Sequence, residues 1–247
     1  MENLEINSDV IDAVATAVRK YRDVRRTTPH VELELRLGSR GKGGRFVAGC
    51  SREFVHAALA RVLKSSAFVQ SDWNECHDFF YLANGDAVRS RVSFNTDNLE
   101  LTRVTVKKKR IYDVVLACGE VMIRVALNLE TPYTQPLPFV VTTTHMRIQQ
   151  RRSFTYGGSK STDTDKCWAY DFSLTWAGKT KNDAEARQNS EDAIFEMEIE
   201  LLSFQYLTRN SDEHVAASLL MKACDFIEDG RKNIQVQTMA APTKSVR

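Results

Sequence analysis

The sequence predicts a mainly β protein of the α+β class, built on an antiparallel sheet that either closes into a barrel or folds as a sandwich. Three observations support this class: many consecutive segments have strand character, the turns between them are short, and helical segments occur only at the ends and in one early insertion. Short turns join strands that run in opposite directions, so the sheet is expected to be antiparallel. The few helices are then expected to pack outside it.

Three segments have the apolar spacing of helices. The first runs from about Ser8 to Tyr21, and the second from about Ser51 to Lys64. The third runs from Ser211 to Asp229, and Gly230 is its expected stop.

Nine further segments have the alternation or the β-branched and aromatic content of strands. They are His30–Leu37, His77–Ala83, Asp86–Asn95, Leu101–Lys109, Tyr112–Leu116, Glu120–Glu130, His145–Tyr156, Lys166–Trp176 and Ala193–Phe204. Asn84-Gly85 is a strong short-hairpin signal. The charged segment Ala177–Asp192 has no periodicity and is expected to be an exposed loop.

Length and composition limit the classes of protein that need to be considered. We expect one domain over residues 1–230 and a mobile C-terminal tail over 231–247. The 34 Lys and Arg against 32 Asp and Glu give a net charge of +2, which argues against a polybasic nucleic-acid coat. No apolar run is long enough for a bilayer, the start lacks signal-peptide features, and the five cysteines have no metal-site spacing. We therefore expect a reduced, intracellular protein with no membrane partner.

Glutamates alternate with apolar residues in two distant strand segments. Alternation places the charged residues of each segment on one face: Glu32, Glu34 and Arg36 in the first, and Glu196, Glu198 and Glu200 in the second. An ordinary strand with a solvated face would explain either segment alone. Like charges on one face repel, however, unless a cation or basic groups lie opposite them. Clustered carboxylates without His or Cys suit Mg²⁺ or Mn²⁺ rather than zinc.

The middle strands carry the opposite charge. Residues 86–152 hold 11 basic and 6 acidic side chains, whereas residues 182–229 hold 3 basic and 12 acidic ones. Basic side chains share strand faces: Arg89 with Arg91, Arg103 with Lys107 and Lys109, and Arg147 with Arg151. If these faces point inward, a triphosphate would bind between a basic floor and an acidic metal cluster. The run Lys107–Arg110 is also consistent with a solvated edge, a generic nucleic-acid patch or a nuclear-localisation patch.

The charged segments resemble the motifs of the triphosphate tunnel metalloenzymes, and among them the metal-dependent RNA 5′-triphosphatases of mRNA capping in fungi, protozoa and some large DNA viruses. Val31–Gly38 resembles the ExExK motif, with Arg36 in place of lysine, and Phe195–Leu201 resembles the last glutamate motif. Leu127–Glu130 is similar to the mid-barrel acidic motif, and Arg147–Phe154 to the basic RxKxRxS strand. The resemblance covers residues 30–204 and implies a closed antiparallel β-barrel of about eight strands, with a few external helices, whose tunnel binds a triphosphate end.

The resemblance also implies a role for each matching residue. The metal would be held directly by Glu32, Glu34 and Glu200, and directly or through water by Glu198 and Glu196. Phosphate contacts would come from Arg91, Lys109, Arg124, Arg147 and Arg151. Glu130 would orient or activate the attacking water, and Asp171 would hold one basic side chain in place.

Two positions depart from the family pattern. Gln149 stands where lysine is usual, and Ala169 stands where the fungal enzymes usually have arginine. Arg36 or Lys107 would then supply the missing positive charge, and Arg89 is an alternative to Arg91 because both point to one face.

Together these assignments predict a hydrolase, an RNA triphosphatase (polynucleotide 5′-phosphatase). It would use Mg²⁺ or Mn²⁺ to remove the γ-phosphate of nascent triphosphate-ended mRNA in the first step of cap formation. Two alternatives stay open: a phosphohydrolase for inorganic triphosphate or nucleoside triphosphates on the same fold, and a noncatalytic nucleic-acid-binding β-barrel. No KxDG motif of guanylyltransferases is present, so that partner would be a separate chain. We expect a nuclear location for a cellular enzyme and a cytoplasmic or virion location for a viral one, and leave the oligomeric state open.

Overall fold

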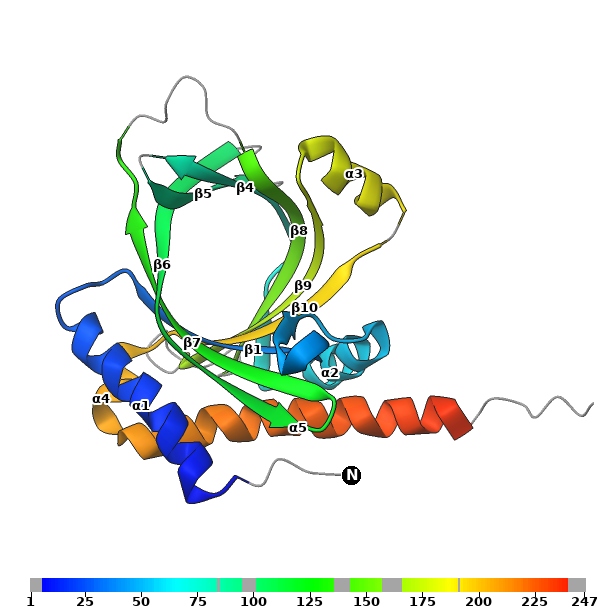
Figure 1. Cartoon of the computed structure of the whole chain (residues 1–247). Coiled ribbons are helices and arrows are strands. Elements are labelled where there is room, and N and C mark those ends of the chain that lie inside the picture. Colours follow the sequence, from blue (N-terminus) through cyan, green and yellow to red (C-terminus); the bar gives the residue numbers. More distant parts are fainter. Residues whose placement is uncertain are drawn as a thin grey trace, which may run out of the picture.

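The chain forms a closed β-barrel with its helices outside (Figure 1). The computed structural model describes residues 6–83, 85–94, 101–135, 143–156, 166–190 and 192–239. Eight strands form the wall: β1 (Val31–Arg40), β4 (Asn74–Ala83), β5 (Asp86–Phe94), β6 (Leu101–Cys118), β7 (Val121–Pro132), β8 (Thr143–Tyr156), β9 (Trp168–Gly178) and β10 (Ile194–Leu201). Two three-residue strands, β2 (Phe46–Ala48) and β3 (Phe68–Gln70), pair with β1 and β8. A short 3-10 turn over Lys42–Gly44 lies between β1 and β2.

Strand β1 closes the barrel because it pairs with both β7 and β10. Around the wall the order is β1, β10, β9, β8, β4, β5, β6 and β7, and each of these pairs is antiparallel. This arrangement confirms the predicted mainly β fold with a closed antiparallel barrel, and it excludes the sandwich alternative.

Most of the predicted strands are present, with one difference that affects the site. Ala83 pairs with Asp86, so the predicted short hairpin is confirmed, although Asn84 itself lies outside the described residues. The two segments predicted on either side of Arg110 form one strand, β6, whose register shifts between Arg110 and Tyr112. Such a bulge inserts one residue without ending the strand, and it exchanges the two faces beyond that point. β2 and β3 are too short to give a periodic signal in the sequence.

The first two predicted helices are confirmed. α1 (Ser8–Arg25) begins after Asn7, whose side chain accepts a hydrogen bond from the Val10 N–H. α2 (Arg52–Lys64) begins after Ser51, which accepts one from the Phe54 N–H.

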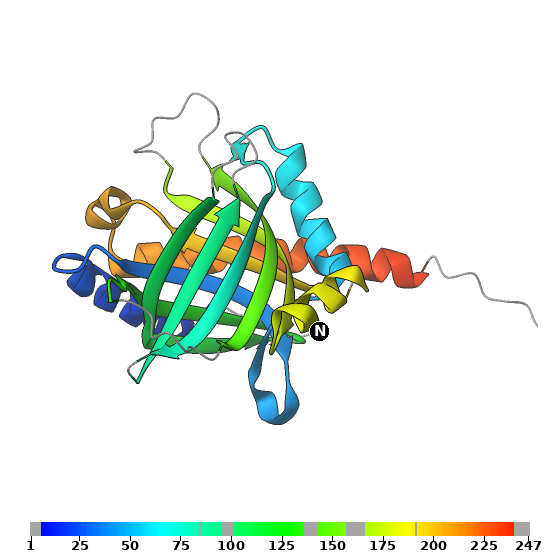
Figure 2. The same ribbon diagram turned by 90° about the horizontal axis from the view of Figure 1, so that it is seen from above.

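The third predicted helix, α5 (Asp212–Met239), is longer than expected. The predicted stop at Gly230 is wrong, because the helix continues through it, and the expected tail is helical as far as Met239. α5 runs along the outside of the barrel and extends beyond it (Figure 2). Gly230 serves packing, since any side chain there would collide with the Phe54 ring of α2. Residues 240–247 lie outside the described chain, and the division into one domain and a mobile tail stays a prediction.

The loop predicted over Ala177–Asp192 is also wrong, because it contains α3 (Lys181–Asn189). This helix starts with a capping box in which Thr180 and Asp183 each bond the other's backbone N–H. Ala184 is its one buried residue, so the apolar periodicity used for the other helices is missing. α4 (Phe204–Arg209) follows β10, which ends earlier than predicted.

The hydrophobic core lies between the barrel and the helices α1, α2 and α5. On β1 it takes Leu33, Leu35 and Leu37, and on β10 it takes Met197 and Ile199. Burying each of these side chains stabilises the fold by about 1.5–3 kcal/mol. Because side chains alternate along a strand, the charged residues between them must point into the barrel. In the part of the chain that the structure describes, no helix has the length and apolar character needed to cross a membrane.

Candidate active site

Five glutamates line the inner face of two neighbouring strands, β1 and β10. They are Glu32, Glu34, Glu196, Glu198 and Glu200. The register pairs Glu34 with Glu200 and Arg36 with Glu198. The Arg36 guanidinium contacts the Glu198 carboxylate. We call the five glutamates the carboxylate wall. Closure of the barrel brings together the two strands that carry them, which are distant in the sequence.

The carboxylate wall holds more negative charge than the protein neutralises. Burial, followed by the charge of neighbouring carboxylates with Glu32 the strongest, raises the pKa of Glu200 to about 8. Within the described residues the Glu200 side chain makes no ion pair. Burial also raises the pKa of Glu32, and Lys108 offsets only part of that effect. A cation bound beside Glu200 would relieve this repulsion.

Glu34 is better compensated than Glu200. Burial alone would raise its pKa, but Lys108 and Arg36 lower it overall. The Asn128 amide also donates a hydrogen bond to Glu34 Oε1 at 2.9 Å. Glu34 is therefore ionised at neutral pH and available as an oxygen ligand.

Lys108 projects into the barrel from β6 and connects two acidic residues. Its Nζ lies 2.8 Å from Glu130 Oε1 and 3.4 Å from Glu32 Oε2. Arg89 donates from Nη2 to Glu130 Oε2 at 2.7 Å. Burial alone would raise the pKa of Glu130, but Lys108 and Arg89 lower it overall, so Glu130 remains a hydrogen-bond acceptor.

Lys107 and Lys109, predicted to bind phosphate, do not enter the barrel. Alternation around the inward Lys108 places both on the outer face. Lys107 Nζ lies 2.6 Å from Asp86 Oδ1, and Lys109 is exposed beside the outward Leu129. The predicted orientation of this strand is wrong because the run Lys107–Arg110 places basic residues on both faces, so the sequence gives no preference for either.

A fully buried aspartate, Asp78 on β4, organises two of the predicted phosphate ligands. Its side chain is 0% exposed. Arg91 donates to it twice, from Nε at 2.7 Å and from Nη2 at 2.9 Å, and Arg147 donates from Nη2 at 2.6 Å. Burial alone would raise the pKa of Asp78, but the two arginines lower it overall. Asp78 was not among the residues predicted from the sequence, although a single acid in the strand segment Cys76–Phe80 was a usable signal.

Gln149 connects the arginines to the carboxylate wall. Its side-chain oxygen accepts hydrogen bonds from Arg151 at 3.2 Å and Arg91 at 3.4 Å. Its amide nitrogen donates to Glu196 at 3.3 Å and to Thr175 at 3.2 Å. Both ends of this buried amide are therefore used. A glutamine at this place orients charged neighbours without adding a charge of its own.

The remaining predicted basic residues also lie inside the barrel. Arg151 donates to Asp171 at 2.8 Å and approaches Glu198 at 3.5 Å. Arg124 Nε lies 3.4 Å from Asp113 Oδ2. We call Arg89, Arg91, Arg147 and Arg151, together with Asp78, the arginine wall; its members belong to β4, β5 and β8.

Several of these arginines have a buried Nε donor that makes no hydrogen bond within the described protein. The buried Nε atoms without a hydrogen-bond partner belong to Arg36, Arg89, Arg124, Arg147 and Arg151. Buried polar groups in proteins are hydrogen-bonded in the great majority of cases. Arg124 Nε is still ion-paired with Asp113, but the other four donors, inside one barrel, indicate an anionic ligand with several oxygens.

The carboxylate wall also fits a divalent metal ion by its chemistry. Its donors are oxygens alone, which Mg²⁺ and Mn²⁺ prefer, and Oδ1 of the adjacent Asp171 is buried without a hydrogen bond. Burial and the neighbouring carboxylates raise the pKa of Glu200, an effect that a bound cation would oppose. In the described part of the chain, no three acidic, His or Cys side chains already surround a metal-sized position. Binding of a metal would therefore require the carboxylate side chains to move.

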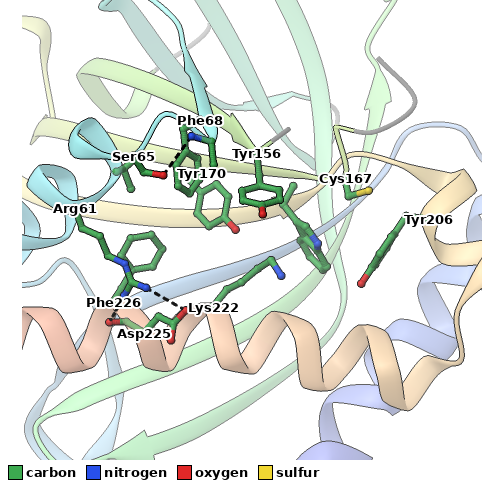
Figure 3. Close-up of a pocket in the computed structure, with 13 residues that line it drawn as sticks. Arg61, Ser65, Phe68, Tyr156, Cys167, Tyr170, Tyr206, Lys222, Asp225 and Phe226 are labelled. Carbon is green, nitrogen blue, oxygen red and sulfur yellow. Dashed lines mark hydrogen bonds and ion pairs between the residues drawn. The ribbon is translucent and has the colours of Figure 1, made fainter. Parts of the chain in front are cut away.

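Two cavities lie near the barrel and differ in character. One, of about 420 Å³, opens at the end where β1 begins, and Glu32, Glu130 and Glu200 line it. The other, of about 580 Å³, lies outside the barrel between α2, α5 and β9, and six of its thirteen lining residues are aromatic. Figure 3 shows Lys222 of α5 reaching into this second cavity among tyrosines. None of the predicted site residues lines it, so the first cavity is the entrance relevant to the candidate active site.

The overall fold is that of RNA triphosphatases. No protein-family model and no curated protein sequence matches this chain. Among solved structures, the Pct1 RNA triphosphatase of S. pombe aligns with a TM-score of 0.60 and 17% identity over 92% of this chain and 93% of that one. Pct1 in complex with the Spt5 CTD gives 0.62 and 16%, over 92% and 94%. The triphosphatase of the mimivirus capping enzyme gives 0.56 and 12%, over 88% and 97%.

Proposed function

We propose that this protein is a metal-dependent RNA 5′-triphosphatase. It hydrolyses the bond between the β- and γ-phosphates of triphosphate-ended RNA and leaves a diphosphate end, the first step of cap formation. The shared fold supports this proposal, and the opposed carboxylate and arginine walls supply the chemistry that the reaction needs.

The observation that carries the proposal is the set of four orphaned Nε donors within the barrel, those of Arg36, Arg89, Arg147 and Arg151. A triphosphate has enough oxygens to satisfy them all, and guanidinium groups match phosphate geometry well. In a site shielded from water these hydrogen bonds are also stronger than in solution. A noncatalytic nucleic-acid binder would have no need to enclose such donors together with five glutamates.

Each part of the site has a task in this reaction. Arg91 and Arg147, already oriented by Asp78, would bind phosphate oxygens and stabilise the charge of the transition state. Glu130, held ionised by Lys108 and Arg89, would accept a hydrogen bond from the attacking water and align it with phosphorus. Glu32, Glu34 and Glu200, with Glu198 and Glu196 directly or through water, would hold Mg²⁺ or Mn²⁺, which when bound would neutralise charge on the phosphate oxygens.

The remaining proposals follow from this function. The diphosphate product is the substrate of an RNA guanylyltransferase, which we propose is a separate chain. We also propose a nuclear location if the protein is cellular, and a cytoplasmic or virion location if it is viral.

A release assay tests the proposed function. Pure protein is incubated with γ-labelled triphosphate-ended RNA, with Mg²⁺, with Mn²⁺ or with a chelator, and labelled phosphate is measured. We expect release that requires the metal. Metal-independent release, or full activity of Glu32→Ala or Glu198→Ala, would refute the proposal.

A second candidate substrate is inorganic triphosphate or a nucleoside triphosphate. The carboxylate wall and the arginine wall favour this alternative, because their charged groups suit phosphates and none of the groups described there would recognise a base. Running the same assay with these substrates distinguishes the two, because much faster hydrolysis of a free triphosphate would move the assignment to that substrate.

A further inference from the structure

Strand β6 carries a second group of basic residues on the face that points away from the barrel interior. We call Arg103, Lys107 and Lys109 the outer basic row. Their outward orientation follows from the register. Arg103 lies opposite Val92 and Lys107 opposite Val88, whereas the inward Arg89 and Arg91 of β5 lie opposite Val106 and Val104. Lys109 lies opposite the outward Leu129 of β7. Arg103 and Lys109 are exposed, and the Lys107 side chain is 42% exposed. None of the described helices covers this part of β6 in Figure 1.

The charge of the outer basic row is mostly uncompensated. Lys107 pairs with Asp86, but Arg103 and Lys109 form no ion pair within the described residues. Alternate residues of a strand lie about 6.7 Å apart, so the row presents like charges in a line rather than as a cluster. A line of cations suits an extended polyanion better than a compact one.

An aromatic ring lies beside this row on the same outer face. Tyr81 of β4 aligns with Val88 of β5, and through it with Lys107. The ring is half-buried, and it lies parallel to the ring of Phe79, with centroids 6.5 Å apart. Burial raises the pKa of Tyr81 and Arg103 opposes that rise, so these two side chains are electrostatic neighbours. Aromatic rings beside a basic line are the usual means of binding single-stranded nucleic acid.

The same strand connects the outer basic row to the entrance cavity. The inner side of β6 contributes Val104 and Val106 to that cavity, next to Glu130. At the start of β6, Leu101 is 67% exposed and Val104 is 57% exposed. A chain that leaves the cavity at this end therefore meets an apolar rim and then the basic row.

We propose that the outer face of β4–β6, with Tyr81, Arg103, Lys107 and Lys109, binds the single-stranded RNA that follows the triphosphate end. This inference rests on the proposed function and extends it, since it gives the protein a preference for RNA over free triphosphate. The inside of the barrel binds the triphosphate end of the substrate, and the outer basic row binds the RNA that follows this end.

The test compares two substrates in charge-removing variants. In Arg103→Gln/Lys107→Gln/Lys109→Gln we expect KM for a 20-nucleotide triphosphate-ended RNA to rise about tenfold, and its salt dependence to weaken by roughly 2 in the log–log slope. kcat/KM for inorganic triphosphate should change no more than in the control Lys179→Gln/Lys181→Gln/Arg187→Gln, which removes three exposed charges on or beside α3. Tyr81→Leu should weaken RNA binding by about tenfold through lost stacking.

Binding of a labelled single-stranded RNA with a 5′-hydroxyl, followed by fluorescence anisotropy, tests the surface independently of hydrolysis. If the protein hydrolyses no triphosphate but the triple variant still loses RNA affinity, the proposed function fails and the RNA surface stands. Unchanged RNA affinity and KM in the triple variant would overturn the inference. An equal loss of kcat/KM for RNA and for inorganic triphosphate would overturn it as well. Full RNA affinity in Tyr81→Leu would also overturn it, because the surface would then act through charge alone, which would suit an acidic protein partner.

Discussion

The carboxylate wall and the arginine wall face the same space but are stabilised in different ways. The arginine wall contains its own counter-charge, because the buried Asp78 holds Arg91 and Arg147 in place before any ligand binds. The carboxylate wall is only partly compensated, by Arg36 and Lys108, and burial together with the neighbouring carboxylates raises the pKa of Glu200 to about 8. One wall is thus organised in advance for an anion, whereas the other is left to be completed by a cation.

This difference separates the two contributions to phosphoryl transfer. Preorganised donors stabilise transition-state charge without having to reorganise during the reaction. A metal-binding wall instead makes activity depend on an added ion. Substitutions in the carboxylate wall should therefore act mainly on metal-dependent activity, whereas those in the arginine wall should act on both stability and activity.

Removing charge from the carboxylate wall should abolish catalysis without unfolding the protein. Glu34→Gln keeps the shape of the side chain but removes a metal ligand, so we expect phosphate release to fall about a thousandfold. The measurement is γ-phosphate release at saturating Mg²⁺, with circular dichroism as the check on folding. Glu120→Gln, an exposed residue in the turn between β6 and β7, should keep its activity. Comparable activities of the two variants would contradict the role of this wall.

Removing the counter-charge from the arginine wall should lower both stability and activity. In Asp78→Asn two half-buried arginines lose their fully buried anionic partner, so we expect the free energy of unfolding to fall by about 3 kcal/mol. Urea unfolding measures this change, and kcat should fall about a hundredfold as well. Asp86→Asn breaks the exposed pair with Lys107 and should cost at most about 0.5 kcal/mol. Equal losses in the two variants would refute the proposed role of Asp78.

The pH dependence of stability should have opposite signs at the two walls. The folded-state pKa of Glu200 lies above its unfolded value, so the metal-free protein loses stability as pH rises from about 4.5 towards 8. Glu200→Gln removes this loss. The stability advantage of the variant over the wild type should therefore be roughly 2 kcal/mol larger at pH 8 than at pH 5. Asp78, whose pKa is lowered, contributes stability above about pH 3.8 that is lost in acid. Parallel pH profiles of Glu200→Gln and wild type, measured by urea unfolding without metal, would contradict the first expectation.

The smallest effect concerns the orientation of β6. Lys108→Met removes the cation that bridges Glu130 and Glu32, and we expect kcat/KM for inorganic triphosphate to fall about tenfold. Lys109→Met, one residue further along but on the outer face, should leave that value nearly unchanged. A larger loss in Lys109→Met would restore the orientation that the sequence predicted.

Much of the candidate site could be predicted because strand alternation is a local property. The spacing of Glu32 and Glu34, and of Glu198 and Glu200, already places each pair on one face of its strand. Asp78 could not be recognised in the same way, because its importance comes from its register with Arg91 on β5 and with the more distant Arg147 on β8. α3 was missed for a different reason, since it starts with a capping box but buries almost nothing.

The sequence by itself determined which residues share a strand face and that opposite charges belong to different parts of the chain. The tertiary structure decided which face is inside. On β1 and β10 the apolar face packs against helices, so burial settles the orientation. On β6 both faces carry basic residues, so burial offers no such choice. There the register with β5 and β7 and the bulge after Arg110 place Lys108 in the barrel and Lys107 and Lys109 outside it.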